Sequence, residues 1–394
     1  MKNKSVAVLD VRSYEVTFLI GGKGINGTFV RRGSKTVKYE GYTSEGFLDG
    51  ESFRSAVKSC VESVLSNYGG EIKEIFVGVP SAFCEIQTKG HTISFPAKRR
   101  LKADAFDFLF ESGLSDILSS GRYIYRSDMY FSTGDNRKYF SADELYKAST
   151  SLLKGALCYY FASEPFFALV DPLLKELGFE KAEYLPVTLA ESLYLLPKKK
   201  REGYAFLLDF GFLSSSVSVV YGNGIVHEES FDFGAGHILM ALMDGLNVEY
   251  EQAEEILLGA DISGGATPKD LIWTSLEGNS YSVSEINEII KYNLDEICER
   301  VDGFFSKYYR DKSVPGFAQN PVSLTGEGCS MVRGAAEHIS KRLGRLTEVV
   351  APDLPYYDKP AYSSQTALLA LAIRKGESKG LKEKLFNIFG GKNK

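Results

Sequence analysis

The chain has 394 residues, a length that predicts two or more lobes rather than one small domain. Its composition, 44% hydrophobic and 25% charged, is typical of a globular protein, and no stretch reaches the roughly 20 apolar residues of a membrane-spanning helix. The net charge of −5 excludes a general attraction to nucleic acid, and the five scattered cysteines lack zinc-binding spacing.

In the first half of the sequence, apolar strands alternate with amphipathic helices. The predicted elements are, in chain order, two strands within 6–20, a helix over 50–69, a buried strand over 74–80, a strand–helix–strand–helix series from 81 to 148, a strand over 155–163, and helices over 165–179 and 188–197. The last helix of the series is predicted to begin at Ser141 as its N-cap. The charged stretch 198–203 is predicted to be a break on the surface.

One glycine-rich stretch, GGKGING at 21–27, matches the G-x-G-x-x-G pattern of dinucleotide-binding loops through Gly22, Gly24 and Gly27. That pattern requires a helix to follow it, whereas the next residues, TFVRR, are typical of a strand. The stretch is therefore interpreted as a hairpin turn rather than a nucleotide site.

The second half is predicted to contain a hairpin, a helical region and a final α/β segment. Its elements are, in chain order, a strand–turn–strand hairpin over 205–224, helices within 234–257, a loop-rich stretch at 259–282 with the only tryptophan (Trp273), a long amphipathic helix over 283–309, a strand, glycine turn and helix over 321–344, and a small-residue helix over 363–375. The four histidines lie far apart and are interpreted as packing or surface residues.

Two hairpins in the sequence resemble each other. VAVLDVRSYEVTFLIGGKG at 6–24 and AFLLDFGFLSSSVSVVYGNG at 205–224 each have an apolar strand that ends in Leu-Asp, a turn with small hydroxyl residues, and a second strand. They lie about 200 residues apart, a spacing that indicates two related α/β halves rather than a solenoid. Two such halves would place two acidic hairpins on opposite sides of one cleft.

Such a cleft suits a nucleotide with a metal ion. Backbone N–H groups in tight turns bind anions, and serine hydroxyls add donors. Asp10 and Asp209, at the ends of the two strands, are candidates to hold Mg²⁺ through water. The turn LTGEG at 324–328 has glycines that let a base or ribose approach closely. For any one turn alone, a plain β-hairpin remains the alternative.

With these motifs, the chain resembles the superfamily of actin, heat-shock chaperones and sugar kinases, and within it FtsA, the bacterial actin homologue of cell division. The stretches that carry the resemblance are 6–13 at the first phosphate motif, 207–216 at the second, 322–344 at the adenosine motif, and 177–196, 231–256 and 360–372 elsewhere. Together they cover nearly the whole chain.

The resemblance implies an α/β, actin-like fold of two related lobes around a nucleotide cleft, with an FtsA-type inserted subdomain and a C-terminal amphipathic helix. The implied parts are a first-lobe core (1–80 and 161–197), the insert (81–160), a second-lobe core (198–235 and 301–373), a small helical subdomain (236–300), a hinge (374–380) and a membrane-targeting tail (381–394).

The family's function would follow from this fold. FtsA-like proteins bind ATP with Mg²⁺, polymerise head to tail into protofilaments, and recruit the tubulin homologue FtsZ and other division proteins. The resemblance therefore implies a peripheral membrane protein of the septum, on the cytoplasmic face of the inner membrane, that does not bind nucleic acid.

The sequence departs from the family at the nucleotide motifs. Arg12 and Ser13 replace the glycine and threonine of the first motif, and the second motif has lost two glycines and its final aspartate, now Ser216. We therefore expect ATP binding to be weak or absent and hydrolysis negligible, and we assign no catalytic residue. The candidate nucleotide-binding residues are Asp10, Arg12, Ser13, Asp209, Gly211, Ser214, Ser215, Ser216, Glu254, Gly326 and Gly328, with Asp10 and Asp209 as metal ligands if Mg²⁺ binds.

Arg12 has two interpretations. Its guanidinium has the geometry to donate directly to a phosphate. Alternatively, it fills an empty pocket and pairs with Asp10 or Asp209, which is the interpretation that the other losses favour.

The tail is basic, whereas the rest of the chain is acidic. Residues 374–394 hold seven basic and two acidic side chains, a balance of +5, which leaves −10 on the rest. On a helix, apolar and basic side chains of the tail would form a membrane-binding face; these are Leu381, Lys382, Lys384, Leu385, Phe386, Ile388 and Phe389. The alternatives are a helix docked on the body and a disordered end.

Two other functions stay open. A pilus-assembly actin homologue of the PilM type shares the inserted subdomain but is expected to lack the amphipathic tail. A sugar or acetate kinase of the same superfamily needs a general base in the cleft and intact glycine turns, and the sequence shows neither clearly.

Overall fold

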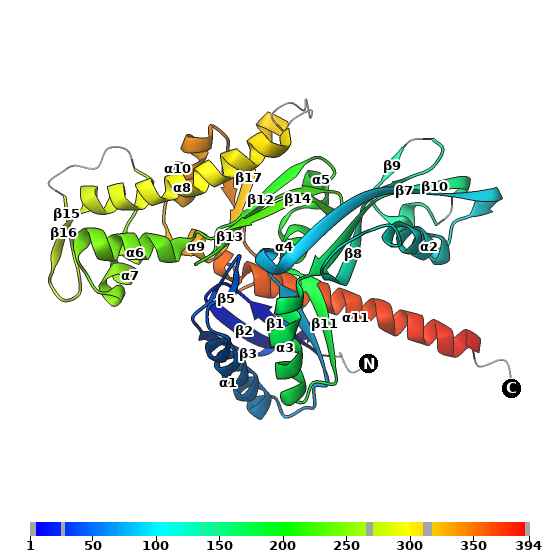
Figure 1. Ribbon diagram of the computed structural model, residues 1–394, viewed down its shortest axis with the longest axis horizontal. Helices are drawn as coiled ribbons and strands as arrows, with labels where there is room; N and C mark the ends of the chain where they lie inside the picture. The colour runs from blue at the N-terminus through cyan, green and yellow to red at the C-terminus, as the bar shows by residue number, and fades with distance from the viewer. Residues whose placement is uncertain are drawn as a thin grey trace.

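Two five-stranded sheets form the centre of the computed structural model (Figure 1). The structure describes residues 5–24, 28–135, 137–146, 148–264, 271–309 and 317–390, and for residues 318 and 378–390 it describes the backbone alone. Within these ranges, one four-stranded sheet and two short hairpins lie outside the central sheets.

The first central sheet has the strand order β11-β6-β1-β2-β3. Its strands are β1 (Val6–Val11), β2 (Glu15–Lys23), β3 (Phe29–Lys38), β6 (Glu74–Val79) and β11 (Lys181–Pro186). The strand β3 directly after the glycine-rich stretch confirms that no helix follows it, although residues 25–27 themselves lie outside the described ranges.

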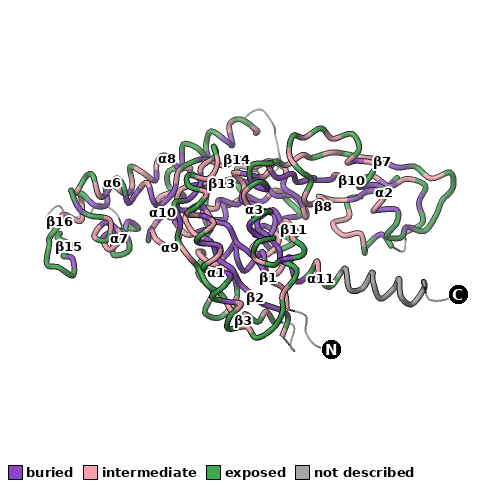
Figure 2. The backbone as a smooth tube through the Cα atoms, turned by 60° about the horizontal axis from the view of Figure 1, so that its bottom comes forward, coloured by how far each residue is buried: buried purple, intermediate pink, exposed green. Residues whose placement is uncertain are grey.

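Helices cover both faces of this sheet. They are α1 (Gly50–Tyr68), α3 (Glu164–Glu176), α4 (Val187–Leu195) and α11 (Ser363–Gly390). Successive side chains of a strand point to opposite faces, so Ala7 and Leu9 of β1 pack with α1 and α3, whereas Val8 packs with α4 and α11. Strands β1, β2 and β6 are therefore the buried centre of the first lobe, as the purple tube at β1 and β2 in Figure 2 shows, whereas the edge strand β3 is partly exposed.

The second central sheet has the order β14-β13-β12-β17-β18 and repeats the first. Its strands are β12 (Ala205–Asp209), β13 (Ser215–Tyr221), β14 (Gly224–Phe231), β17 (Val322–Thr325) and β18 (Thr347–Val349). In both sheets an antiparallel meander is followed by two parallel strands. The internal similarity that the two hairpins predict is thus present in the topology.

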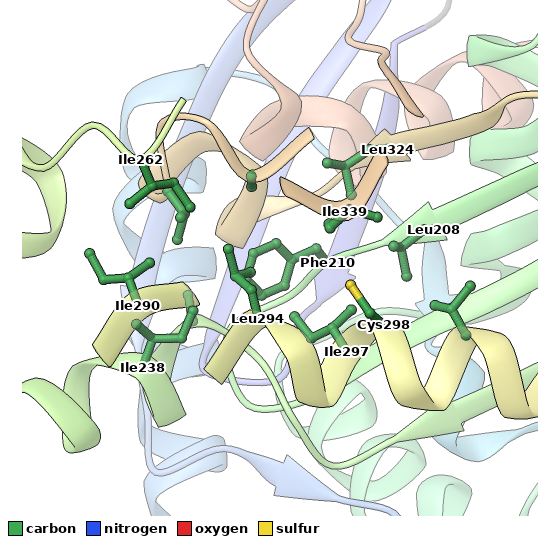
Figure 3. Packing of buried hydrophobic residues seen from close by; sticks show 14 of the residues in the cluster. Leu208, Phe210, Ile238, Ile262, Ile290, Leu294, Ile297, Cys298, Leu324 and Ile339 are labelled. Carbon is green, nitrogen blue, oxygen red and sulfur yellow. The ribbon is translucent and has the colours of Figure 1, made fainter. Parts of the chain in front are cut away.

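Five helices accompany this second sheet. They are α6 (Ala235–Leu246), α7 (Tyr250–Gly259), α8 (Val283–Tyr309), α9 (Glu327–Met331) and α10 (Ala335–Leu343). Helix α8 has the predicted bounds, and its buried side chains Leu294 and Ile297 pack around Phe210, together with Ile339 of α10 (Figure 3). The loop-rich stretch 259–282 contains a small hairpin of β15 (Ile272–Thr274) and β16 (Ser280–Ser282).

The four-stranded sheet is inserted between β6 and α3. It has the order β7-β10-β8-β9, and its elements are β7 (Cys84–Arg100), α2 (Ala103–Leu114), β8 (Arg122–Ser132), β9 (Lys138–Tyr139) and β10 (Ser149–Ala162). The predicted helix after Ser141 is wrong, although the Ser141 hydroxyl does cap a single turn (Ala142–Glu144). The chain then enters β10, because β7 and β8 pair with it on both sides.

The charged stretch 198–203 is also different from the prediction of a surface break. It forms the short helix α5 (Lys198–Arg201), and Arg201 is buried. The Arg201 guanidinium donates to the backbone carbonyls of Leu196 and Gly222 and to the side chain of Asn223. A buried cation is tolerated here because these acceptors replace water.

The predicted hinge at 374–380 is not a break either, because α11 runs without interruption from Ser363 to Gly390. Lys375 lies 3.2 Å from the carboxylate of Glu183, and Glu377 lies 3.1 Å from the ammonium of Lys23. The membrane-binding side chains predicted from 381 onwards lie outside the described side chains. In the part of the chain that the structure describes, no helix has the length and hydropathy to cross a membrane.

Candidate functional site

The turns that follow β1 and β12 face each other between the two lobes and border a cavity of about 40 Å³. Eight of the predicted site residues line it: Arg12, Ser13, Asp209, Gly211, Ser214, Ser215, Ser216 and Gly326. The other three, Asp10, Glu254 and Gly328, lie outside its described lining. The structure therefore brings these eight residues together around one cavity, and the remaining question is what they do in it.

The backbone amides that would hold a phosphate already have an acceptor. The N–H groups of Leu213 and Ser214 donate to the hydroxyl oxygen of Ser13 at 3.0 and 3.3 Å. The N–H of Gly211 donates to the Ser215 hydroxyl at 3.2 Å, and that hydroxyl donates to a backbone carbonyl. The turn after β12 is thus satisfied by serine side chains rather than left open for an anion.

Aromatic side chains fill the space next to this turn. Phe212, at a position where the resemblance leads us to expect a glycine, is buried and stacks on Tyr14 with ring centroids 4.2 Å apart. The Lys38 ammonium lies over the Tyr14 and Tyr250 rings, 5.3 and 5.9 Å from their centroids. Glu254, a predicted nucleotide-binding residue, lies 3.8 Å from Lys38 as an ion pair.

Arg12 is engaged with protein groups. Its guanidinium donates to the carbonyl of Ala361 at 2.9 Å and forms a close ion pair with Glu15. Longer ion pairs join it to Glu327 at 3.8 Å and to Asp10 at 3.9 Å. These contacts support the interpretation that Arg12 fills the pocket, with Glu15 and Glu327 as partners that the sequence analysis did not consider.

The two strand-end carboxylates are in different surroundings. Asp10 is fully buried and accepts a hydrogen bond from the Ser364 hydroxyl at 2.6 Å; burial raises its pKa, which Arg12 and Ser364 partly offset. Burial raises the pKa of Asp209 to about 6, and the charge of Arg12 opposes that shift. Both carboxyl groups therefore lie where the charged form is disfavoured.

Two further acidic residues lie in the same region and were missed by the sequence analysis. Glu191 of α4 lines the cavity, is 1% exposed, and has one carboxylate oxygen without a hydrogen-bond partner. Burial, then Asp209, raises the pKa of Glu191, and burial raises the pKa of Glu228 on β14 to about 7. Glu191 had a signal, because it is the only charged residue in the apolar helix 187–195.

The glycines of the adenosine motif serve backbone packing. Gly326 has a φ of +99°, and a Cβ there would lie 2.3 Å from a carboxylate oxygen of Asp209. A Cβ on Gly328 would lie 2.6 Å from the ring of Phe210. The Gly328 N–H also donates to the carbonyl of Phe210 at 2.8 Å. Both positions thus require glycine because of the residues that follow β12.

A magnesium nucleotide does not fit this arrangement. Ligand pockets usually measure about 300–1,000 Å³, so a cavity of about 40 Å³ holds little more than water. Among the described residues, no group of three or more His, Cys, Asp or Glu side chains is arranged to hold a metal ion. Weak or absent ATP binding by this chain stays a prediction.

Comparison with known proteins identifies the fold. No protein-family model matches the sequence, and no curated protein matches it. Among solved structures, the chain is similar to the PilM–PilN type IV pilus biogenesis complex, with a TM-score of 0.61 at 11% identity over 93% of this chain and 98% of that one.

Two further structures show the same similarity. The ethanolamine utilization protein EutJ from Carboxydothermus hydrogenoformans has a TM-score of 0.54 at 11% identity, over 94% of this chain and 91% of that one. An MreB of Spiroplasma citri, solved with bound AMPPNP, has a TM-score of 0.53 at 10% identity, over 98% and 99%. At such identities the likeness shows the fold alone. The chain therefore has the mixed α/β, actin-like fold of two lobes around a cleft.

Proposed function

We propose that the protein is an actin-like adaptor of cell division that tethers FtsZ-type filaments to the inner face of the cytoplasmic membrane. It assembles with copies of itself into protofilaments and does so without an ATPase cycle. The observation that carries the proposal is an intact two-lobe fold whose cleft is filled by its own side chains, with a cavity of only about 40 Å³. A scaffold that keeps this fold without room for nucleotide is suited to assembly rather than turnover.

The tail supplies the membrane contact in this proposal. Leu381, Leu385, Ile388 and Phe389 recur at helical spacing beside lysines, a pattern typical of helices that lie in the membrane interface. The part of α11 that precedes them is held on the first lobe by the ion pair of Lys375 with Glu183. A tail bound to anionic lipid would therefore keep the body close to the membrane surface.

Vesicle sedimentation tests the proposal. The full chain is mixed with the FtsZ of its own cell and vesicles that contain phosphatidylglycerol, and the pellet is assayed for both proteins. We expect both in the pellet. The double substitution Leu385→Glu with Phe389→Glu should leave both in the supernatant, whereas the matched control Leu118→Glu with Leu276→Glu should not change the result, since these leucines are exposed elsewhere. FtsZ that stays in the supernatant with the unaltered chain would contradict the tethering function.

A second candidate is a pilus-assembly role of the PilM type. The TM-score to the PilM–PilN complex is 0.61, against 0.54 and 0.53 for the other two structures. A cavity of about 440 Å³ lies between α3, β8 and β11, lined by Ile124, Phe167 and Tyr184 among others. β11 is an edge strand and β8 pairs with β9 only at residues 131–132, so the cavity has room for an extended peptide beside free strand edges.

A pull-down separates the two candidates. Binding of a PilN-type protein from the same cell, without binding of FtsZ, would favour the pilus role. A kinase function is disfavoured, since the cleft has no space for a phosphoryl donor and an acceptor side by side.

A further inference from the structure

Where a nucleotide would join the two lobes, side chains of one lobe contact the other directly. We infer that these contacts form a latch that replaces the nucleotide and holds the lobes in one closed arrangement. The inference rests on the proposed nucleotide-independent adaptor and adds how its conformation is set. The latch consists of Ser13, Tyr14, Lys38 and Ser44 from the first lobe and Phe212, Leu213, Ser214, Asp232, Tyr250 and Glu254 from the second.

The centre of the latch is polar. A serine hydroxyl oxygen has two lone pairs, and in Ser13 it accepts from both Leu213 and Ser214, 200 and 201 residues further along the chain. Two convergent N–H groups are the usual host of an anion oxygen. The Ser13 hydroxyl oxygen therefore takes the place of such an oxygen at the N–H groups of Leu213 and Ser214.

An aromatic layer lies beside this centre. Tyr14 and Phe212 stack almost in parallel, at an angle of 16°, and Phe212 is 5% exposed. Leu213 packs against Gly41, since a Cβ at residue 41 would lie 2.5 Å from a Leu213 methyl group. These are apolar contacts between lobes, so opening the cleft would expose buried surface to water.

The rim of the cleft adds a directional contact. The backbone N–H and the hydroxyl of Ser44 both donate to the carboxylate of Asp232, at 2.7 and 2.5 Å. Lys38 and Glu254 form the ion pair on the other side. Both contacts are exposed to solvent, so each adds little to the free energy of closure. Their main role is to fix the position of one lobe relative to the other.

The consequence concerns control. A ligand shifts a two-state equilibrium only by its difference in affinity for the two states. If the chain's own contacts already hold the lobes closed, ATP cannot shift the chain towards the closed state. Changes of conformation must then come from a partner or from assembly. Removal of the latch should then both loosen the lobes and uncover an anion-binding turn.

Hydrogen exchange on the full chain, with and without millimolar Mg-ATP, tests this inference. In the unaltered protein, we expect slow exchange at 211–216 and no effect of Mg-ATP. In the variant Ser13→Gly with Phe212→Gly, exchange at these amides should rise at least about tenfold, and Mg-ATP should slow it again. Ser218→Ala is the control, because among the described residues the buried Ser218 hydroxyl has no hydrogen-bond partner, and the residue lies outside the latch.

Two results would overturn the latch. One is a clear slowing of exchange by Mg-ATP in the unaltered protein, and the other is a folded double variant whose exchange at 211–216 is unchanged. If the double variant does not fold, the single change Ser44→Ala, at an exposed site, must still raise exchange at 41–44 by a few fold. Vesicle sedimentation measures neither hydrogen exchange nor the effect of Mg-ATP. A failure of FtsZ tethering would therefore not contradict the latch, and a failure of the latch would not contradict FtsZ tethering.

Discussion

The two hairpins of the cleft share a topology but have opposite roles. The β1–β2 turn presents side chains, above all the Ser13 hydroxyl and the Arg12 guanidinium, whereas the β12–β13 turn presents backbone N–H groups. The hydroxyl oxygen of one turn accepts hydrogen bonds from the amides of the other, so the two turns are joined without a ligand. The comparison teaches that a side-chain acceptor on one turn and backbone donors on the other can form an internal contact between the lobes.

The largest effect is expected at Phe210, which follows the strand-end aspartate of the second hairpin as Val11 follows that of the first. Phe210 is fully buried among side chains of α8 and α10, so Phe210→Ala should lower the free energy of unfolding by about 3–5 kcal/mol. Urea unfolding followed by circular dichroism measures this. The control Phe108→Ala, at a residue that is 57% exposed, should change it by less than about 0.5 kcal/mol.

A loss below about 1 kcal/mol for Phe210→Ala would mean that the second hairpin does not depend on its aromatic core. The difference between the hairpins would then lie only in the turn residues.

The next test uses pH to measure the cost of burying Asp209, one of the two strand-end aspartates. The folded-state pKa of Asp209 is raised from 3.8 to about 6, so the cost of its buried charge is absent below pH 4, develops from about 4 to about 6, and is complete above that. Asp209→Asn removes the cost and should raise the free energy of unfolding by about 3 kcal/mol at pH 7.5 and by much less at pH 4.

The measurement is urea unfolding across this pH range. Exposed Asp143→Asn is the control and should give the same curve as the unaltered protein. The Asp209→Asn variant could instead be less stable than the unaltered protein at pH 7.5. That result would indicate that a partner stabilises the Asp209 carboxylate by more than the cost of burying its charge.

A smaller effect is expected from the serines of the two hairpins. Ser13→Ala leaves the N–H groups of Leu213 and Ser214 without their acceptor and should lower the free energy of unfolding by about 1–2 kcal/mol. Ser218→Ala removes a buried hydroxyl that has no partner and should be neutral or slightly stabilising. Equal effects of the two substitutions, measured by thermal unfolding, would contradict the role given to Ser13.

The sequence predicted those parts of the fold that depend on local pattern. The helix at 283–309 has the expected bounds because its apolar spacing continues through its whole length. The first residues of β10 were not predicted as strand, and β11 was not predicted, because both are strands through pairing with segments far away in the chain. Local residue preferences cannot report such pairing.

The candidate site was predicted in its location but not in its contacts. Motif spacing identified both turns, yet the contact between Ser13 and Leu213 spans 200 residues and follows only from the folded lobes. Tyr14, Lys38 and Tyr250 carry no motif, so their place in the cleft could not be read from the sequence. Glu191 was the one missed residue with a usable local signal.

The smallest effect is expected at the rim, where Lys38 pairs with Glu254. Lys38 is 54% exposed, so Lys38→Ala should lower the free energy of unfolding by less than about 1 kcal/mol, and less still at 0.5 M salt than at low salt. Thermal unfolding at the two salt concentrations measures this, with Lys58→Ala, which removes another exposed ion pair, as the control. A loss as large as that of Ser13→Ala would indicate that the lysine at the edge, rather than the serine at the centre, makes the main contact. The salt dependence distinguishes the two, because salt screens exposed charges and leaves buried hydrogen bonds unaffected.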